Sequence, residues 1–358
     1  MNLMGCAKMK TPSFHLKNLI IKPTLNCNAK CSFCEQRLEH YKSSNQSKLS
    51  IKKWENVLNE AASLGVNSIS ISGGEPTLYN HLFELIELCK ERSFKVHLKT
   101  NGFLINDEYA DKLLVSGLDS CTISIYSQSS TIHDQSKRLS GSHISAINAI
   151  GYLKRCGIET NVQTVLTSDL MNDFDKYLNW IGQLDINNLF ISYLEGNHSV
   201  GRPSVTEIKK FVSVMIPKCK KSLSNTLSGK SKPLLNMDLK NLDSLFQFDN
   251  VSYEGLSKGL YNKADLDGCG RNHSMALILS NGEIHPCNAI EYFHEPVVGN
   301  LIDESLTDAW QSATWEKVKL YGPGLCHLCP MNRHTFISFT EQDDEPSFYS
   351  PPNELDEY

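Results

Sequence analysis

Three cysteines stand close together near the start of the chain, at positions 27, 31 and 34 within LNCNAKCSFCEQR. Their spacing is C-x3-C-x2-C. A structural zinc ion takes four protein ligands, and a disulfide needs a geometry that such short spacings rarely allow. An iron–sulfur cube has four irons, so three thiolates leave one iron free for another ligand. The spacing therefore favours a cluster at which a substrate or cofactor can bind.

Four further cysteines gather toward the other end of the chain: Cys269, Cys287, Cys326 and Cys329. Four thiolates could ligate every iron of a second [4Fe–4S] cluster, which could then transfer electrons but not bind substrate through an iron. The same arrangement, with a C-x2-C pair after an expected hairpin, also suits a four-cysteine zinc ribbon. Spacing alone does not decide between the two.

The composition is that of an ordinary globular protein, with 358 residues, 40% apolar, 21% charged and a net charge of −5. This charge gives no indication of nucleic acid or an anionic membrane as a partner. The chain has no run of 18 apolar residues and no apolar segment of a signal peptide, so we expect a cytoplasmic protein. In that reducing compartment, clustered cysteines more often bind metal than form disulfides.

These cysteines must be positioned by the elements around them. Short apolar runs alternate with amphipathic helical patterns from residue 17 to about 200. The expected strands cover 18–25, 67–72, 95–100, 120–126, 159–167 and 188–195. Such alternation predicts an α/β fold with a parallel sheet, open or closed into a barrel, and with its chemistry at the carboxyl ends of the strands.

A second motif, Gly73-Gly74-Glu75-Pro76, follows the second expected strand. With the C-x3-C-x2-C spacing, and with Phe33 just before the third cysteine, the chain resembles the radical S-adenosylmethionine (SAM) enzymes. The resemblance covers roughly residues 17–200 and implies a partial (β/α)6 TIM-like barrel. It also implies reductive cleavage of SAM to methionine and a 5′-deoxyadenosyl radical, which takes a hydrogen atom from a substrate C–H bond.

The resemblance also implies which residues contact SAM. The glycines of the Gly73–Pro76 motif would let the backbone approach the methionyl ammonium group. Further contacts are expected at the ends of later strands, from Thr100, Asn101, Ser124 (ribose), Gln163 or Thr164, and Ile191 (beside the adenine). Strand alternation places Ser124 on the same face as Thr122, with Cys121 pointing away from the barrel interior.

The C-terminal cysteines are similar to the SPASM/Twitch extension of radical SAM enzymes. No cysteine follows Cys329, so we expect the shorter Twitch form with one auxiliary [4Fe–4S] cluster, making two clusters in all. The strong turn signal Asn281-Gly282 predicts its hairpin. The expected divisions are an N-terminal extension (1–16), the radical SAM barrel (17–204), a helical connector (205–265), a small β-hairpin/helix Twitch domain (266–338) and an acidic tail (339–358).

The resemblance implies an oxidoreductase or maturase supplied with electrons by a flavodoxin- or ferredoxin-type donor. Its substrate would be a peptide or a small molecule. We expect modification of a peptide or protein by oxidation, cross-linking or epimerisation, although the short segment before the first strand leaves no room for a leader-peptide-binding domain. The alternatives are a dehydrogenase or epimerase of a sugar or aminocyclitol and, more distantly, a non-catalytic metal-binding protein. Candidate substrate contacts are Glu195, Asn197, His198, Arg202, Tyr253 and Tyr261.

Overall fold

The computed structural model describes residues 15–34, 49–194, 200–219, 221, 274–286, 297–321 and 335–338. Within these residues the strands form a single sheet in the order β10-β6-β5-β4-β3-β2-β1-β7-β8-β9. No helix of this part of the chain has both the length and the apolar character needed to cross a membrane.

Six parallel strands form the centre of the sheet, in sequence order. They are β1 (Asn18–Lys22), β2 (Ser68–Ile71), β3 (Lys95–Thr100), β4 (Ser120–Ser124), β5 (Glu159–Leu166) and β6 (Asn188–Tyr193). The six strands predicted from the apolar runs are confirmed. Each strand is joined to the next by a crossover that contains a helix, so the order of the strands in the sheet follows the chain. The crossover from β1 to β2 is longer than the others, because a long segment precedes α2.

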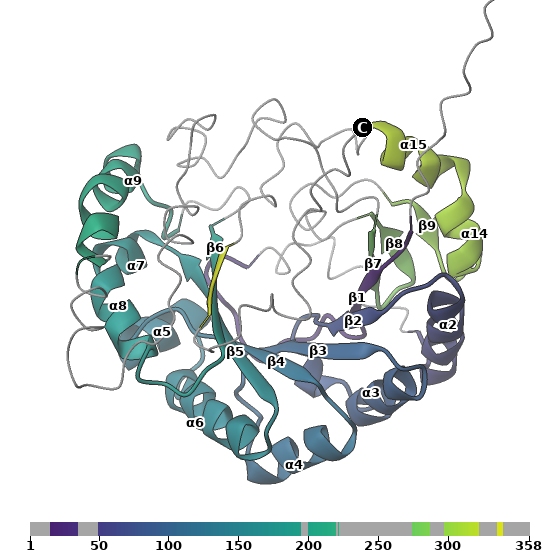
Figure 1. Cartoon of the computed structure of the whole chain (residues 1–358), viewed down its shortest axis with the longest axis horizontal. Coiled ribbons are helices and arrows are strands. Elements are labelled where there is room, and N and C mark those ends of the chain that lie inside the picture. Colours follow the sequence, from purple (N-terminus) through teal and green to yellow (C-terminus); the bar gives the residue numbers. More distant parts are fainter. Residues whose placement is uncertain are drawn as a thin grey trace, which may run out of the picture.

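The helices cover the convex side of the curved sheet (Figure 1). They are α2 (Ile51–Ser63), α3 (Leu82–Glu91), α4 (Asp107–Val115), α5 (Ser130–Lys137), α6 (Ser142–Arg155), α7 (Ser168–Asn172) and α8 (Phe174–Ile181). The apolar pattern of DFDKYLNWIGQL at 173–184 predicts one helix, and the structure has α8 there, preceded by the short separate helix α7. The helix α5 was not predicted, because its sequence STIHDQSK has little apolar periodicity.

Strand alternation gives the sheet two different faces. Residues such as Ile21, Leu98 and Cys121 are fully buried in the apolar core beneath the helices. The opposite, inner face carries polar side chains that bond across strands: His97 Nδ1 lies 2.8 Å from Ser120 Oγ, and Gln163 Nε2 donates to Ser192 Oγ at 2.9 Å. The prediction that Cys121 points away from the interior is confirmed.

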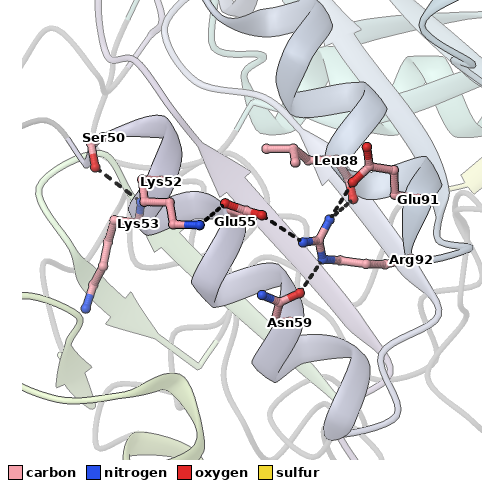
Figure 2. Close-up of polar contacts among 8 residues, drawn as sticks. All are labelled: Ser50, Lys52, Lys53, Glu55, Asn59, Leu88, Glu91 and Arg92. Carbon is pink, nitrogen blue, oxygen red and sulfur yellow. Dashed lines mark hydrogen bonds and ion pairs between the residues drawn. The ribbon is translucent and has the colours of Figure 1, made fainter.

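The contact between α2 and α3 shows how the outer helices are joined to one another (Figure 2). Arg92, directly after α3, donates from Nε to Asn59 Oδ1 at 2.7 Å and lies 3.6 Å from Glu55 Oε1, both on α2. The start of α2 is capped by Ser50 Oγ, which accepts from the Lys53 N–H at 3.2 Å. A partly exposed ion pair at this distance contributes little, so the apolar contacts beneath it, including the fully buried Trp54, hold the two helices on the sheet.

The C-terminal hairpin extends the same sheet beyond β1. It contains β7 (Met275–Leu279) and β8 (Glu283–His285), followed by β9 (Gly299–Asn300), and β7 runs parallel to β1. Gly282 has a φ of +91° in the turn, as the Asn-Gly signal predicts.

Two helices then follow, α14 (Leu306–Gln311) and α15 (Ala313–Tyr321). In the sequence, Leu306, Ala309, Trp310 and Ala313 have the spacing of one face of a continuous helix. The extended backbone of Ser312 (ψ 152°) instead ends α14 before Ala313. A last strand, β10 (Thr335–Ser338), pairs antiparallel with β6 and was not predicted.

The connector begins as a helix, as its apolar pattern predicts. The helix α9 (Val205–Lys210) starts with a capping box between Ser204 and Glu207 and continues into the π-helical turn η4 (Phe211–Met215). The sequence also predicts a helix over 236–248 in this connector, and that segment lies outside the described residues.

Candidate functional site

The three N-terminal cysteines lie on the segment that leaves the carboxyl end of β1, residues 23–34, here named the cysteine loop. The Cys27 side chain is exposed and those of Cys31 and Cys34 are partly exposed. The loop folds tightly on itself: Ala29 N–H donates to Cys27 Sγ at 3.4 Å and Cys34 N–H donates to the Cys31 carbonyl at 3.3 Å. All three thiols are therefore held at the edge of the sheet that the sequence predicts.

One support of the cysteine loop is the backbone after β2. Gly74 N–H donates to the Thr24 carbonyl at 2.9 Å, and Glu75 N–H donates to the Asn26 carbonyl at 2.7 Å. A Cβ atom on Gly73 would lie 2.3 Å from the Thr24 oxygen, and one on Gly74 would lie 2.3 Å from the Asn26 oxygen. The glycines were expected to permit close approach of a ligand; in the structure they permit close approach of the cysteine loop itself.

The Glu75 carboxylate is almost fully buried and ties this support to the end of β3. Its Oε1 accepts from Thr77 Oγ1 at 2.6 Å and from Thr100 Oγ1 at 2.5 Å, and its Oε2 accepts from the Asn101 N–H at 2.8 Å. Pro76 begins the short helix η3 (Pro76–Leu78) directly after it. Glu75, Thr100 and Asn101 were predicted as SAM contacts, and the geometry shows that they also fix one another.

Asn101 carries this network back to the cysteine loop, because its Nδ2 donates to Asn28 Oδ1 at 2.7 Å. The same Asn101 accepts at its backbone carbonyl from the ammonium of Lys137, at 3.2 Å. Lys137 also donates to the Ser124 carbonyl at 2.8 Å, so one side chain joins the carboxyl ends of β3 and β4.

The end of α5 forms a second support. The carbonyls of Lys137 and Ser136 accept from Lys30 N–H at 2.9 Å and from Ser32 N–H at 3.0 Å. The Lys137 side chain is completely buried, and burial lowers its pKa to about 8 even though the Cys31 thiol and Glu75 raise it. Sequence reasoning missed Lys137, because nothing local distinguishes it from a lysine on a solvated helix end.

Aromatic contacts close this side of the loop. The Phe33 and Tyr126 rings meet edge to face with centroids 4.9 Å apart, and the Lys137 ammonium lies 5.3 Å from the Tyr126 centroid. The Tyr126 backbone N–H donates to His133 Nδ1 at 3.1 Å. Phe33, predicted as part of the cofactor site, thus anchors the cysteine loop to the segment after β4.

The structure separates the remaining predicted SAM contacts into two groups. Ser124 and Gln163 both lie on the inner face of the sheet, at paired positions of β4 and β5. Ile191 lies on the outer face, fully buried in the apolar core with Leu189. The Ile191 side chain therefore faces away from the predicted SAM site, because the period-two alternation of β6 turns Phe190 and Ser192, not Ile191, inward.

The thiols of the cysteine loop fit an iron–sulfur cluster better than a single ion. Within the described residues, no group of three His, Cys, Asp or Glu side chains could hold one metal ion. In a cubane each thiolate binds a different iron, so the ligands need not meet at one point. Burial, with a further contribution from Cys34, raises the pKa of the less exposed Cys31 to about 12. These thiols thus become thiolates by exchanging their protons for iron.

Comparison with known families agrees with this geometry. Residues 21–181 match the family described as the radical SAM superfamily, and residues 269–330 match an iron–sulfur cluster-binding domain of the SPASM type. The chain belongs to the radical SAM superfamily. It is accordingly an enzyme that uses SAM and iron–sulfur clusters. Cys269, Cys287, Cys326 and Cys329 lie within or at the edge of the second match and outside the described residues.

Curated relatives of this radical SAM enzyme include two AdoMet-dependent heme synthases. The one from Nitratidesulfovibrio vulgaris is 28% identical over 42% of this chain and 41% of its own length; the one from Methanosarcina barkeri is 23% identical over 86% of each. A PqqA peptide cyclase from Granulibacter bethesdensis is 26% identical over 45% of this chain and 42% of its own. The chain thus spans less than half the length of two of these relatives.

A similar fold is found in Streptococcus suis SuiB bound to its precursor peptide SuiA. The two share 19% sequence identity with a TM-score of 0.63, covering 89% of this chain and 71% of SuiB. At this identity the likeness shows the fold alone.

Among the candidate substrate contacts, only Arg202 lies in the described part of the chain. Its Nη1 donates to the Leu194 carbonyl at 2.8 Å, which braces the segment after β6. The others, Glu195, Asn197, His198, Tyr253 and Tyr261, lie outside the described residues.

Proposed function

We propose that this radical SAM enzyme modifies a peptide or protein by oxidising, cross-linking or epimerising a residue at an unactivated C–H bond. The observation that carries the proposal is the cysteine loop, clamped between the backbone after β2 and the end of α5 at the carboxyl edge of a sheet with a polar inner face. This arrangement presents three thiols and a hydrogen-bonding surface on the same side of the fold.

The residues have separate roles in this proposal. Cys27, Cys31 and Cys34 would hold the cluster that binds SAM. The hydrogen bonds of Glu75 and Lys137 fix the position of the cysteine loop relative to the strand ends. When bound, the clusters supply one-electron chemistry: reduction of SAM at the first and removal of an electron from the substrate at the second. We propose Cys269, Cys287, Cys326 and Cys329 as the four ligands of the second, a [4Fe–4S] cluster.

The setting of the reaction follows from the same chemistry. Each turnover needs an electron, and we propose a flavodoxin- or ferredoxin-type protein as its donor. The seven described cysteines are all free thiols, which suits a reducing compartment such as the cytoplasm.

The choice of a peptide substrate is supported by relatives of two kinds. A peptide cyclase is among the curated relatives, and SuiB, which shares the fold, has been crystallised with a precursor peptide. The polar inner face, with Asn161, Gln163 and Ser192, also suits a hydroxyl-rich small molecule. Oxidation or epimerisation of a sugar or aminocyclitol is therefore the second candidate.

The test is an anaerobic assay of the reconstituted, dithionite-reduced enzyme. A library of short peptides and a panel of sugars and aminocyclitols are added separately, and 5′-deoxyadenosine is measured. We expect peptides to raise its formation above the substrate-free rate and to change in mass. Stimulation by the sugar panel alone would overturn the peptide assignment. Failure to form any 5′-deoxyadenosine with fully loaded clusters would contradict the proposed reaction as a whole.

A further inference from the structure

Two lysines face the inner side of the sheet next to the cysteine loop. Lys22 is the last residue of β1, and Lys99 is the penultimate residue of β3. Their strand neighbours Ile21 and Leu98 are fully buried in the outer apolar core, so alternation turns both lysines inward. Lys22 is only 2% exposed.

The sheet register brings the two lysines to the same level. Ile21 pairs with Ile71 of β2, and Ile71 pairs with Leu98 of β3. The next residues, Lys22 and Lys99, therefore lie at the same level of the sheet, with one strand between them. Two strand spacings separate their backbones by about 10 Å, a gap that two lysine side chains can bridge with a ligand between them.

Buried hydroxyl groups lie on the same face. Thr122 pairs with Lys99 in the β3–β4 register and is 2% exposed, and its Oγ1 has no hydrogen-bond partner among the described residues. Ser70 Oγ, on β2 between the two lysine-bearing strands, is also buried and lacks a partner within that part of the chain. A buried hydroxyl without a hydrogen-bond partner lowers the stability of the fold, and a hydrogen bond to a polar ligand would remove this cost.

We propose that Lys22 and Lys99, together with the Thr122 hydroxyl, bind a side-chain carboxylate of the substrate, so that the enzyme acts on an acidic residue of its peptide. This inference rests on the proposed peptide substrate and narrows it. A carboxylate accepts hydrogen bonds from all three groups and is opposite in charge to the two ammonium groups.

The test compares two probes that differ only in charge: the tripeptides acetyl-Ala-Glu-Ala-amide and acetyl-Ala-Gln-Ala-amide. Their binding to the reconstituted enzyme with SAM is measured by anaerobic equilibrium dialysis. We expect the glutamate probe to bind at least tenfold more tightly. Lys22→Met and Lys99→Met should each remove this preference, and Lys22→Arg should restore part of it. The control is Lys176→Met, an exposed lysine of α8 that pairs with Asp173 and should bind as wild type.

Several results would overturn the assignment: equal binding of the two probes to the wild-type enzyme, or a preference that survives in both methionine variants. Inorganic phosphate is added as a third probe. If phosphate binds and depends on Lys22 while the glutamate probe does not, the lysines serve a phosphate-bearing substrate and the acidic-peptide assignment fails. Iron content and circular dichroism check that each variant is folded, and where a variant fails this check the probe pair on the wild-type enzyme decides.

Binding and turnover are separate measurements here. A clear glutamate preference without any peptide-dependent 5′-deoxyadenosine would support the carboxylate site and contradict the proposed peptide modification. Peptide-dependent turnover without a charge preference would support the proposed peptide modification and contradict the carboxylate site.

Discussion

Replacing Gly74 by alanine tests whether the glycine motif serves the cysteine loop. The new Cβ would lie 2.3 Å from the Asn26 carbonyl oxygen and 2.4 Å from that of Leu25. To reach even the 3.0 Å limit of real Cβ contacts, the loop backbone must retreat by about 0.7 Å. Its φ is not positive, so the effect of the substitution is purely steric.

The cost can be worked from the contacts. Overpacking of a tight site costs about 1–3 kcal/mol. The retreat also stretches the bonds from Gly74 N–H to Thr24 and from Glu75 N–H to Asn26, each worth about 0.5–1.5 kcal/mol. We therefore expect Gly74→Ala to lose about 2–6 kcal/mol around the loop. The matched control is Gly151→Ala in α6, where a Cβ meets nothing within 4 Å and alanine should stabilise the helix by about 1 kcal/mol.

The assay is the iron content and the electron paramagnetic resonance signal of each variant after anaerobic reconstitution and reduction. In Gly74→Ala we expect loss of the SAM-responsive cluster signal, with the C-terminal cluster retained, and a lower urea midpoint for the metal-free protein. Gly151→Ala should load both clusters as wild type does. A Gly74→Ala protein with wild-type iron, signal and urea midpoint would refute the reasoning that the glycine is required by backbone contact with the loop.

Three further predictions follow from the site. Glu75→Gln should cost about 3 kcal/mol of unfolding free energy in urea, because either orientation of the amide turns its donor toward a backbone N–H, that of Thr77 or that of Asn101. The exposed Glu84→Gln should cost almost nothing, and equal costs would contradict the buried network. Burial lowers the pKa of Lys22 from 10.5 to about 7, so the unfolded chain binds more protons between these values. Metal-free Lys22→Met should therefore be more stable than wild type below pH 7, by a margin that shrinks as the pH rises toward 10.5; a margin independent of pH in urea titrations would show that Lys22 does not titrate there. Cys31→Ala should abolish 5′-deoxyadenosine formation, whereas Cys329→Ala should keep some of it and lose product formation; equal loss in both would make the second site purely structural.

Much of the fold follows from local patterns in the sequence. The six central strands are short apolar runs whose alternate residues face the helices, and the Asn281-Gly282 turn forms because glycine accepts a positive φ. The spacing of the first three cysteines places them on one loop, so their proximity needs no tertiary information. These features depend on residues within a few positions of one another, which is why they could be predicted.

The features of the site that the sequence did not reveal depend on distant contacts. The role of Lys137 requires α5 to reach the ends of β3 and β4, and that of Gly74 requires β2 to lie beside the loop after β1. The face of Ile191 follows from which side of β6 packs beneath the helices, and an apolar run alone does not reveal this.

Local sequence patterns identify the atoms available for chemistry here: three thiols on one loop, four more far along the chain, and a glycine-rich turn. What surrounds these atoms depends on contacts between distant parts of the chain. The tertiary structure placed a buried lysine behind the loop and two more on the inner face, and it set the C-terminal hairpin against β1. The physical reason is that the energy of a buried charge or a close backbone contact is set by its neighbours in space, and these come from strands and helices separated by many residues in the chain.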